Sequence, residues 1–321
     1  MDMKKKIMTG AVTLLSVAVL AACSQNSKDI VTMKGDTITV DEFYNQVKNS
    51  SAAQEVLLSM TINNVFEKKY GKNVSEKEVN EVYEKSAKTY GDAFSSVLAR
   101  SGLTTETYKA QIRTNKLVEY AVKKAAEKEL NDDAYKAAYE TYTPEVTAQI
   151  IKLSDEATAK SVAEKAKNGE DFTQLAKDNS TDKNTKDKGG ETKFDSASTD
   201  VPDDVKKAAF GLEVNGISDV ITVKASNSST ASYYVVKLTK KTDKSAKWQD
   251  YKKRLKEIIV AQKQSNRSYI QKVISKELSE ANIKVKDQAF QNLFTQYIGS
   301  TGTSSSTSTS GSSSSSGSSS K

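Results

Sequence analysis

The chemistry open to this chain is limited by two residue types. Its 321 residues include no histidine and one cysteine, Cys23. These counts exclude Ser-His-Asp triads, histidine-based zinc sites and imidazole proton shuttles. They also exclude an internal disulfide and a cluster of thiolate ligands. We expect no metal site and no cofactor, so polar chemistry has to come from carboxylates, amides, hydroxyls and lysines.

One amide stands in an unusual place. Residues 146–153 read VTAQIIKL, which is typical of a short β-strand. Alternation along the strand puts Gln149 on the same face as Ile151 and Leu153. An uncharged amide among aliphatic side chains is either a hydrogen-bonded strand residue or the occupant of an active-site position. The sequence alone leaves both interpretations open.

The N-terminus predicts export. Lys4, Lys5 and Lys6 precede the apolar run IMTGAVTLLSVAVLAA, which indicates a secretory signal peptide over residues 1–22. The run is shorter than the roughly 20 residues that a membrane-spanning helix needs. Residues 20–23 read LAAC and match the lipobox of bacterial lipoproteins, which implies a diacylglycerol anchor on Cys23. We therefore expect a lipid-anchored protein at the extracytoplasmic face of the cell membrane; an ordinary secreted protein is the alternative.

The charge pattern argues against nucleic acid as a partner. The formal net charge is +7, yet lysines alternate with acidic residues, as in EKKYGKNVSEKEVNEVYEKSAK, and no block of arginines occurs. Such alternation is typical of a solvated helical surface.

The apolar pattern divides the chain into helical flanks and a β-α module. DIVTMKGDTITVDEFYNQV predicts a strand, a turn, a strand and a helix capped near Asp41, whereas IKVKD near the C-terminus predicts a last short strand. Ser75 and Glu78 predict a capping box at a later helix. After Pro144 the pattern changes to strands with intervening helices, and it returns to helix near residue 243.

These patterns predict an α+β fold with one inserted module. Residues 23–142 and 243–299 carry apolar stripes that have no partner except each other, so we expect them to form one helical domain around the module at 143–242. The same stripes are able to pair between chains, which makes a homodimer a candidate assembly. The Ser-rich tail at 300–321 cannot bury enough apolar surface to order.

The module resembles a known enzyme family. DFTQLAKDNSTD, the double glycine at 189–190, VPDDVKKAAFGLEVNGISDVI and SYYVVKL are similar in type and spacing to parvulin-type peptidyl-prolyl isomerases, over residues 143–241. With the lipobox, the helical flanks and the Ser-rich tail, the whole chain resembles the PrsA family of extracytoplasmic foldase lipoproteins. The resemblance implies a helical chaperone domain built from both flanks, and unfolded or newly translocated secreted proteins as partners.

The resemblance also implies a site. Parvulins place two facing histidines and a Cys or Asp beside an apolar proline slot. By position, Asp182 matches the Cys/Asp, whereas Gln149 and Tyr234 stand where the histidines would be. The slot positions are Thr192, Val201 and Val205.

Only Asp182 keeps the family's residue type. We therefore expect a foldase whose isomerase activity is weak or lost, with an active isomerase that uses a variant site as the alternative. For Asp182 a loop-capping role is the competing interpretation. A solute-binding or adhesin lipoprotein is a third reading, disfavoured because the pattern lacks two α/β lobes around a hinge.

Overall fold

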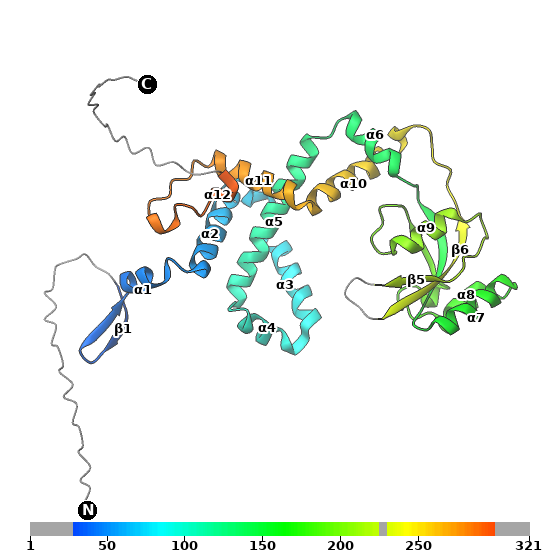
Figure 1. The fold of residues 1–321 in the computed structure, drawn as a ribbon, viewed down its shortest axis with the longest axis horizontal. Helices are drawn as coiled ribbons and strands as arrows, with labels where there is room; N and C mark the ends of the chain where they lie inside the picture. The colour runs from blue at the N-terminus through cyan, green and yellow to red at the C-terminus, as the bar shows by residue number, and fades with distance from the viewer. Residues whose placement is uncertain (1–27, 225–229, 299–321) are drawn as a thin grey trace, which may run out of the picture. The chain divides into compact units, whose positions relative to one another are not determined.

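The computed structural model describes residues 28–224 and 230–298 (Figure 1). Cys23, the predicted signal peptide and the Ser-rich tail lie outside the described residues. The described chain separates into two compact units, one made of residues 28–60 with 284–298 and the other of residues 61–283. Within those ranges no helix is both long and apolar enough to cross a bilayer.

The first unit begins with a hairpin. Strands β1 (Asp29–Met33) and β2 (Asp36–Thr39) pair antiparallel around a turn in which Gly35 has φ +86°, and α1 (Val40–Val47) follows directly. The predicted order of strand, turn, strand and helix is confirmed. The helix is capped near Asp41, as predicted, and the cap itself is Thr39, which forms a reciprocal capping box with Glu42.

The C-terminal part of this unit contains no strand in its described residues. The IKVKD segment lies in a loop, and the 3-10 turn η5 (Gln288–Phe290) and α12 (Thr295–Ile298) follow it. The Tyr44 hydroxyl donates to Asp287 at 2.7 Å, which ties this segment to α1. The predicted last strand is therefore wrong, because Asp287 instead caps the η5 turn.

The second unit contains helices from both sides of the module. The capping box that Ser75 and Glu78 predict is confirmed at the start of α3. In order, the helices are α2 (Ser51–Tyr70, which enters from the first unit), η1 (Gly71–Asn73), α3 (Glu76–Tyr90), η2 (Gly91–Ala93), α4 (Phe94–Arg100), α5 (Thr105–Lys128), α6 (Asp132–Thr141), η4 (Trp248–Tyr251), α10 (Lys252–Ser265) and α11 (Arg267–Glu280).

Two hydrophobic cores join these helices. In one, Val273 of α11 packs with Phe66 of α2 and Leu117 of α5. In the other, Leu255 of α10 packs with Tyr135 of α6, whose ring stacks on that of Trp248. Helices that lie more than a hundred residues apart in sequence therefore bury their apolar stripes against each other.

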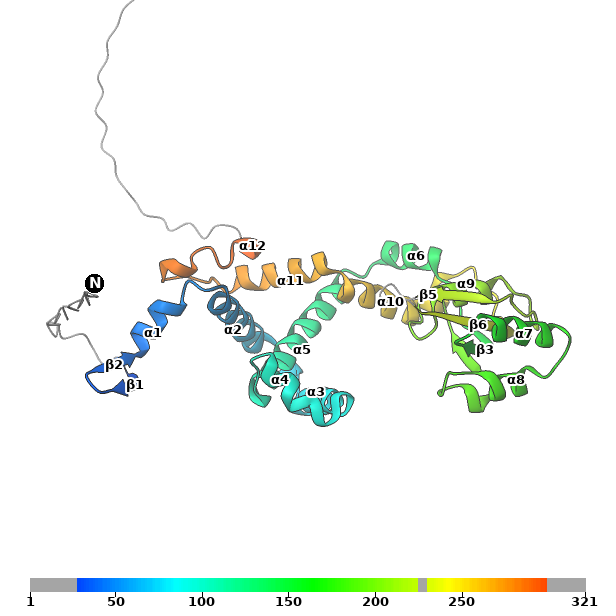
Figure 2. The same ribbon diagram turned by 60° about the horizontal axis from the view of Figure 1, so that its bottom comes forward.

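The module is a four-stranded antiparallel sheet between helices. The strand order is β4-β3-β6-β5, and Figures 1 and 2 show α9 on one side of the sheet with α7 and α8 on the other. The elements are β3 (Val146–Leu153), α7 (Glu156–Lys167), α8 (Phe172–Asn179), η3 (Lys186–Lys188), β4 (Glu191–Phe194), α9 (Asp203–Gly211), β5 (Ile221–Lys224) and β6 (Ala231–Lys240).

Both faces of this sheet carry a core. Val236 and Val205 belong to the core under α9, whereas Ile151 and Phe172 belong to the core under α7 and α8. The adjacent isoleucines of β3, Ile150 and Ile151, are thus buried on opposite faces.

A buried ion pair connects the module to α10. Both carboxylate oxygens of Asp195 accept from the Arg254 guanidinium, at 2.6 Å from Nε and 2.9 Å from Nη2. The Tyr142 hydroxyl and the Ser198 hydroxyl also donate to this carboxylate. Burial alone would raise the pKa of Asp195, but the hydrogen bonds from Arg254 and Ser198 outweigh burial and hold that pKa below its ordinary value.

We expect Asp195→Asn to lower the free energy of unfolding by about 2–3 kcal/mol, because a partly buried guanidinium loses its partner. The native carboxylate stabilises the fold above its unfolded pKa of about 3.9, and this contribution is lost as the pH falls through that value toward the lower folded pKa. Urea unfolding of wild type and variant across pH 2–7 measures both effects.

A suitable control is Asp219→Asn, since that carboxylate pairs with Lys167 but is 94% exposed. If the Asp195 and Asp219 variants had the same free energy of unfolding at neutral pH, a structural role for this ion pair would be contradicted.

Candidate functional site

A pocket opens on the α9 side of the sheet. Its volume is about 330 Å³, at the small end of the range for ligand sites. The ends of β3 and β6, the loop after α8 and the start of α9 form its walls. The lining residues are Ile150, Lys152, Asp182, Asn184, Thr185, Thr192, Asp200, Val201, Pro202, Val205 and Tyr234.

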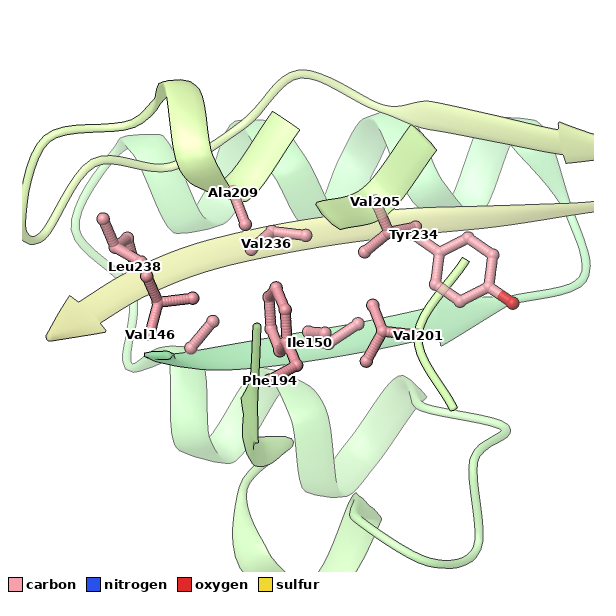
Figure 3. Close-up of a cluster of buried hydrophobic side chains, with 10 residues drawn as sticks. Val146, Ile150, Phe194, Val201, Val205, Ala209, Tyr234, Val236 and Leu238 are labelled. Atoms are coloured by element: carbon pink, nitrogen blue, oxygen red, sulfur yellow. The ribbon is translucent and has the colours of Figure 1, made fainter. Parts of the chain in front are cut away.

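Strand register builds the apolar part of this pocket. Antiparallel pairing of β3 with β6 sets Ile150 opposite Val236 and Lys152 opposite Tyr234, so these side chains share one face. Figure 3 shows the side chains of Ile150, Val201 and Val205 gathered near the Tyr234 ring. Each of the three aliphatic residues and Tyr234 is at most 9% exposed, so the pocket has a packed apolar base.

Gln149 lies outside this pocket. Its side-chain Nε2 donates to Thr173 Oγ1 at 2.8 Å and to the Gly189 carbonyl at 3.0 Å, on the face that α8 covers. The prediction that Gln149 lies in the site is wrong by one residue. Successive side chains of a strand point to opposite faces, so the next residue, Ile150, faces the pocket. Gln149 is a hydrogen-bonded strand residue.

The double glycine lets the loop after α8 lie against β3. Gly190 has φ +80°, and a Cβ on it would stand 2.5 Å from the Ile150 carbonyl oxygen. The Ile150 amide donates to the Gly190 carbonyl at 2.9 Å. Only glycine allows both this backbone conformation and this approach. Strand β4 begins immediately after Gly190, so this close contact also places Thr192 at the pocket.

Asp182 lines the pocket while closing its own loop. Its carboxylate accepts from the Asn184 amide at 3.0 Å and from the Thr185 hydroxyl at 2.8 Å. Its backbone carbonyl accepts from the Lys186 amide. These bonds are those of a loop-capping aspartate. The carboxylate therefore shapes the pocket wall, and both of its oxygens already accept hydrogen bonds.

The polar groups around the apolar base are the Lys152 ammonium, the carboxylates of Asp182 and Asp200, the Asn184 amide and the hydroxyls of Thr185, Thr192 and Tyr234. The Lys152 Nζ lies 6.0 Å from the centre of the Tyr234 ring, and Thr185 adds a hydroxyl. The structure thus brings together Asp182, Tyr234 and all three predicted slot residues. Lys152, Asn184, Thr185, Asp200 and Pro202 were not predicted. For Lys152 the signal was present, since it follows Ile150 by two positions on the same strand face.

This arrangement suits binding of a compact apolar group such as a prolyl ring. Rotation about an X–Pro bond requires no covalent step, only preferential binding of the twisted amide over a barrier of about 18–20 kcal/mol. The apolar base accommodates a ring, and Lys152 and the Tyr234 hydroxyl offer donors to a nearby carbonyl. Ile150 and Tyr234, which β3 and β6 place on the pocket face, supply no imidazole.

Comparison with known proteins places both the module and the flanks. The family model described as "Rotamase: PPIC-type PPIASE domain" matches residues 143–240. The Foldase protein PrsA of Streptococcus gordonii is 68% identical over 307 residues, covering 94% of this chain and 99% of that protein. The Foldase protein PrsA of Streptococcus pneumoniae strain R6 is 60% identical over 306 residues, covering 94% and 98%.

Two solved structures show the same likeness to foldase proteins. The crystal structure of foldase protein PrsA from Streptococcus pneumoniae has 59% sequence identity and a TM-score of 0.78, covering 84% of this chain and 99% of that one. The structure of the foldase protein from Lactococcus lactis has 34% identity and a TM-score of 0.65, with the same coverage.

Proposed function

This chain belongs to the PrsA foldase family, and from that premise we propose that it is a membrane-anchored foldase that assists secreted proteins after their translocation. The observation that carries the proposal is the 68% identity to a protein named as a foldase along 99% of that protein's length. Likeness over this length includes the helical flanks as well as the isomerase-type module. The proposed foldase function therefore belongs to the whole chain and not to the module alone.

We propose that residues 23–142 and 243–299 are the two parts of one helical chaperone domain around the module at 143–242. The packing of Val273 with Phe66 and Leu117 supports this division. Outside the cytoplasmic membrane no ATP drives client release, so binding has to be broad and rapidly reversible.

We further propose that the pocket binds prolyl segments with weak or lost isomerase activity. Its base is apolar, but Ile150 and Tyr234 offer a hydrocarbon and a phenol on the pocket face and no imidazole. The second candidate is an active isomerase with a variant site, and the match of residues 143–240 to the isomerase family favours it.

One pair of assays on the full mature chain tests these proposals. We expect the chain to suppress aggregation of an unfolded secreted protein without ATP, and to leave the rate of a proline-limited refolding reaction within about twofold of buffer, where isomerisation takes tens to hundreds of seconds. Failure to suppress aggregation would contradict the foldase proposal.

Acceleration of refolding by tenfold or more at catalytic concentrations would establish the second candidate instead. In that case Tyr234→Phe, which removes only the hydroxyl, should slow the reaction. Tyr233→Phe is the matched control, because Tyr233 is the neighbouring residue of β6 and packs on the other face of the sheet.

We propose that Cys23 carries the lipid anchor. Burial of its acyl chains in the membrane would contribute about 0.8 kcal/mol of binding free energy for each CH₂ group. Replacement of Cys23 by Ala should therefore move the protein from the membrane fraction to the medium, as measured by fractionation and immunoblotting. Ser24→Ala, one residue on, should leave it in the membrane fraction. Retention of the Cys23 variant in membranes would contradict lipid anchoring.

We propose that the first unit pairs with a second copy of the chain. A two-stranded hairpin is marginal alone, and β1 is exposed along its whole length. Strands β1 and β2, helix α1 and the first part of α2 all carry exposed apolar side chains, which we treat as one surface, and an edge strand of a second copy would pair with β1 about a two-fold axis. The surface comprises Ile30, Val31, Met33, Ile38, Val40, Phe43, Val56 and Met60.

Light scattering during size-exclusion chromatography should therefore find a dimer of the mature chain. Val31→Asp with Phe43→Ser should yield a monomer, because both side chains lie on this surface. Val214→Ser should leave the dimer intact, since Val214 is similarly exposed, at 48%, but belongs to the module. A monomeric wild type at micromolar concentration would count against the pairing.

A further inference from the structure

A second pocket lies among the helices of the larger unit. Its volume is about 480 Å³, and the end of α2, the second half of α5 and most of α11 enclose it. It shares no residue with the pocket of the module. Its lining residues are Lys69, Tyr70, Ala121, Lys124, Ala125, Lys128, Glu129, Tyr269, Lys272, Val273, Lys276, Glu277 and Glu280.

The carboxylates of this pocket already have partners. Glu277, only 7% exposed, accepts from the Tyr70 hydroxyl at 2.7 Å and pairs with Lys69 at 2.5 Å. Lys69 also pairs with Glu280 at 2.7 Å, and Lys263 pairs with Glu129. Each acidic side chain of the lining therefore already has an ammonium partner within ion-pair distance.

Three of the lysines lack ion pairs. Across the part of the chain that the structure describes, no carboxylate lies within 4.0 Å of the ammonium of Lys124, Lys128 or Lys272. Lys124 lies 5.9 Å from the ring centres of Tyr70 and Tyr120. The lining contains five lysines and three glutamates, so its formal charge is +2. The rim therefore attracts anions.

The walls between these lysines are apolar. Val273 and Ala121 are buried there, and Ala125 and the rings of Tyr70 and Tyr269 complete the surface. A ligand made only of phosphates would leave this surface unused. A polypeptide segment with carboxylates next to aliphatic side chains would use both the lysines and the walls.

We propose that this lysine-rimmed pocket binds acidic segments of unfolded client polypeptides that carry carboxylates beside apolar side chains. The inference rests on the proposed foldase function and adds the chemical class of client segment. Attraction between exposed charges speeds encounter more than it strengthens binding, so segments would be captured quickly and released without ATP.

Fluorescence anisotropy with the full mature chain tests the inference. The probe is a short labelled peptide alternating Glu and Leu. We expect Lys124→Gln, Lys128→Gln and Lys272→Gln together to weaken its binding about tenfold, given the modest value of each exposed charge contact. Exchange of the peptide's Glu for Gln should weaken wild-type binding and leave the triple variant unaffected.

The matched control replaces Lys85, Lys88 and Lys207 with Gln, which changes the net charge equally at exposed positions outside the pocket. Its affinity should stay within twofold of wild type. Equal losses in both triple variants would overturn the site in favour of diffuse attraction. Thermal unfolding of each variant verifies that the exposed substitutions leave the fold intact.

Two other outcomes are decisive. If Leu→Ser exchange in the peptide leaves its affinity unchanged and inorganic polyphosphate displaces it, the pocket is a polyanion site and the peptide inference is overturned. If no peptide binds while the chain still suppresses aggregation, this inference fails and the foldase proposal stands. Loss of aggregation suppression by the wild type itself would instead overturn the foldase proposal.

Discussion

The module depends on one constraint: the central strand β3 has to bury side chains on both of its faces. Because its side chains alternate, Ile150 enters the core under α9 while Ile151 enters the core under α8. A shift of one residue would move every side chain to the other face. Pairing with β6 and the close approach of Gly190 to Ile150 hold the register, so the pocket inherits its composition from this one strand.

The same register explains why the pocket differs in chemistry from the isomerases that it resembles. On the pocket face of the two central strands lie Ile150 of β3 and Tyr234 of β6, and the carboxylate of Asp182 is occupied by its own loop. What remains is an apolar base with hydroxyls, one ammonium and the Asp200 carboxylate nearby. Rotation about an X–Pro bond requires only preferential binding of the twisted amide, so such a surface is suited to prolyl segments without any group that transfers a proton.

Polar interactions at positions remote from the pocket connect elements that the chain order separates. Asp195 and Arg254 join the module to α10, and Glu277 joins α11 to the end of α2 through Lys69 and Tyr70. Each buried carboxylate has several donors, as burial of charge requires. Around Glu277 this leaves other lysines of the same pocket without partners, and they are the basis of the inferred client-binding surface.

Much of the local structure was predictable from the sequence, because local signals decide it. The capping box at Ser75, the strand at 146–153 and the hairpin at 29–39 follow from spacing within a few residues. The absence of histidine and the single cysteine likewise bound the chemistry without any structure. Gln149 showed the limit of this approach: its strand face was correctly predicted, but family position placed it one residue away from the site.

Only the tertiary structure decided which side chains share a pocket. Lys152, Asp200 and Thr185 meet because β3, the loop after α8 and the approach to α9 converge in space, and no sequence spacing encodes that convergence. The same holds for Lys124 and Lys272, which come from helices far apart in the chain. Sequence determined the elements and the residue types, because these depend on neighbours along the chain; packing decided the sites, because they depend on neighbours across it.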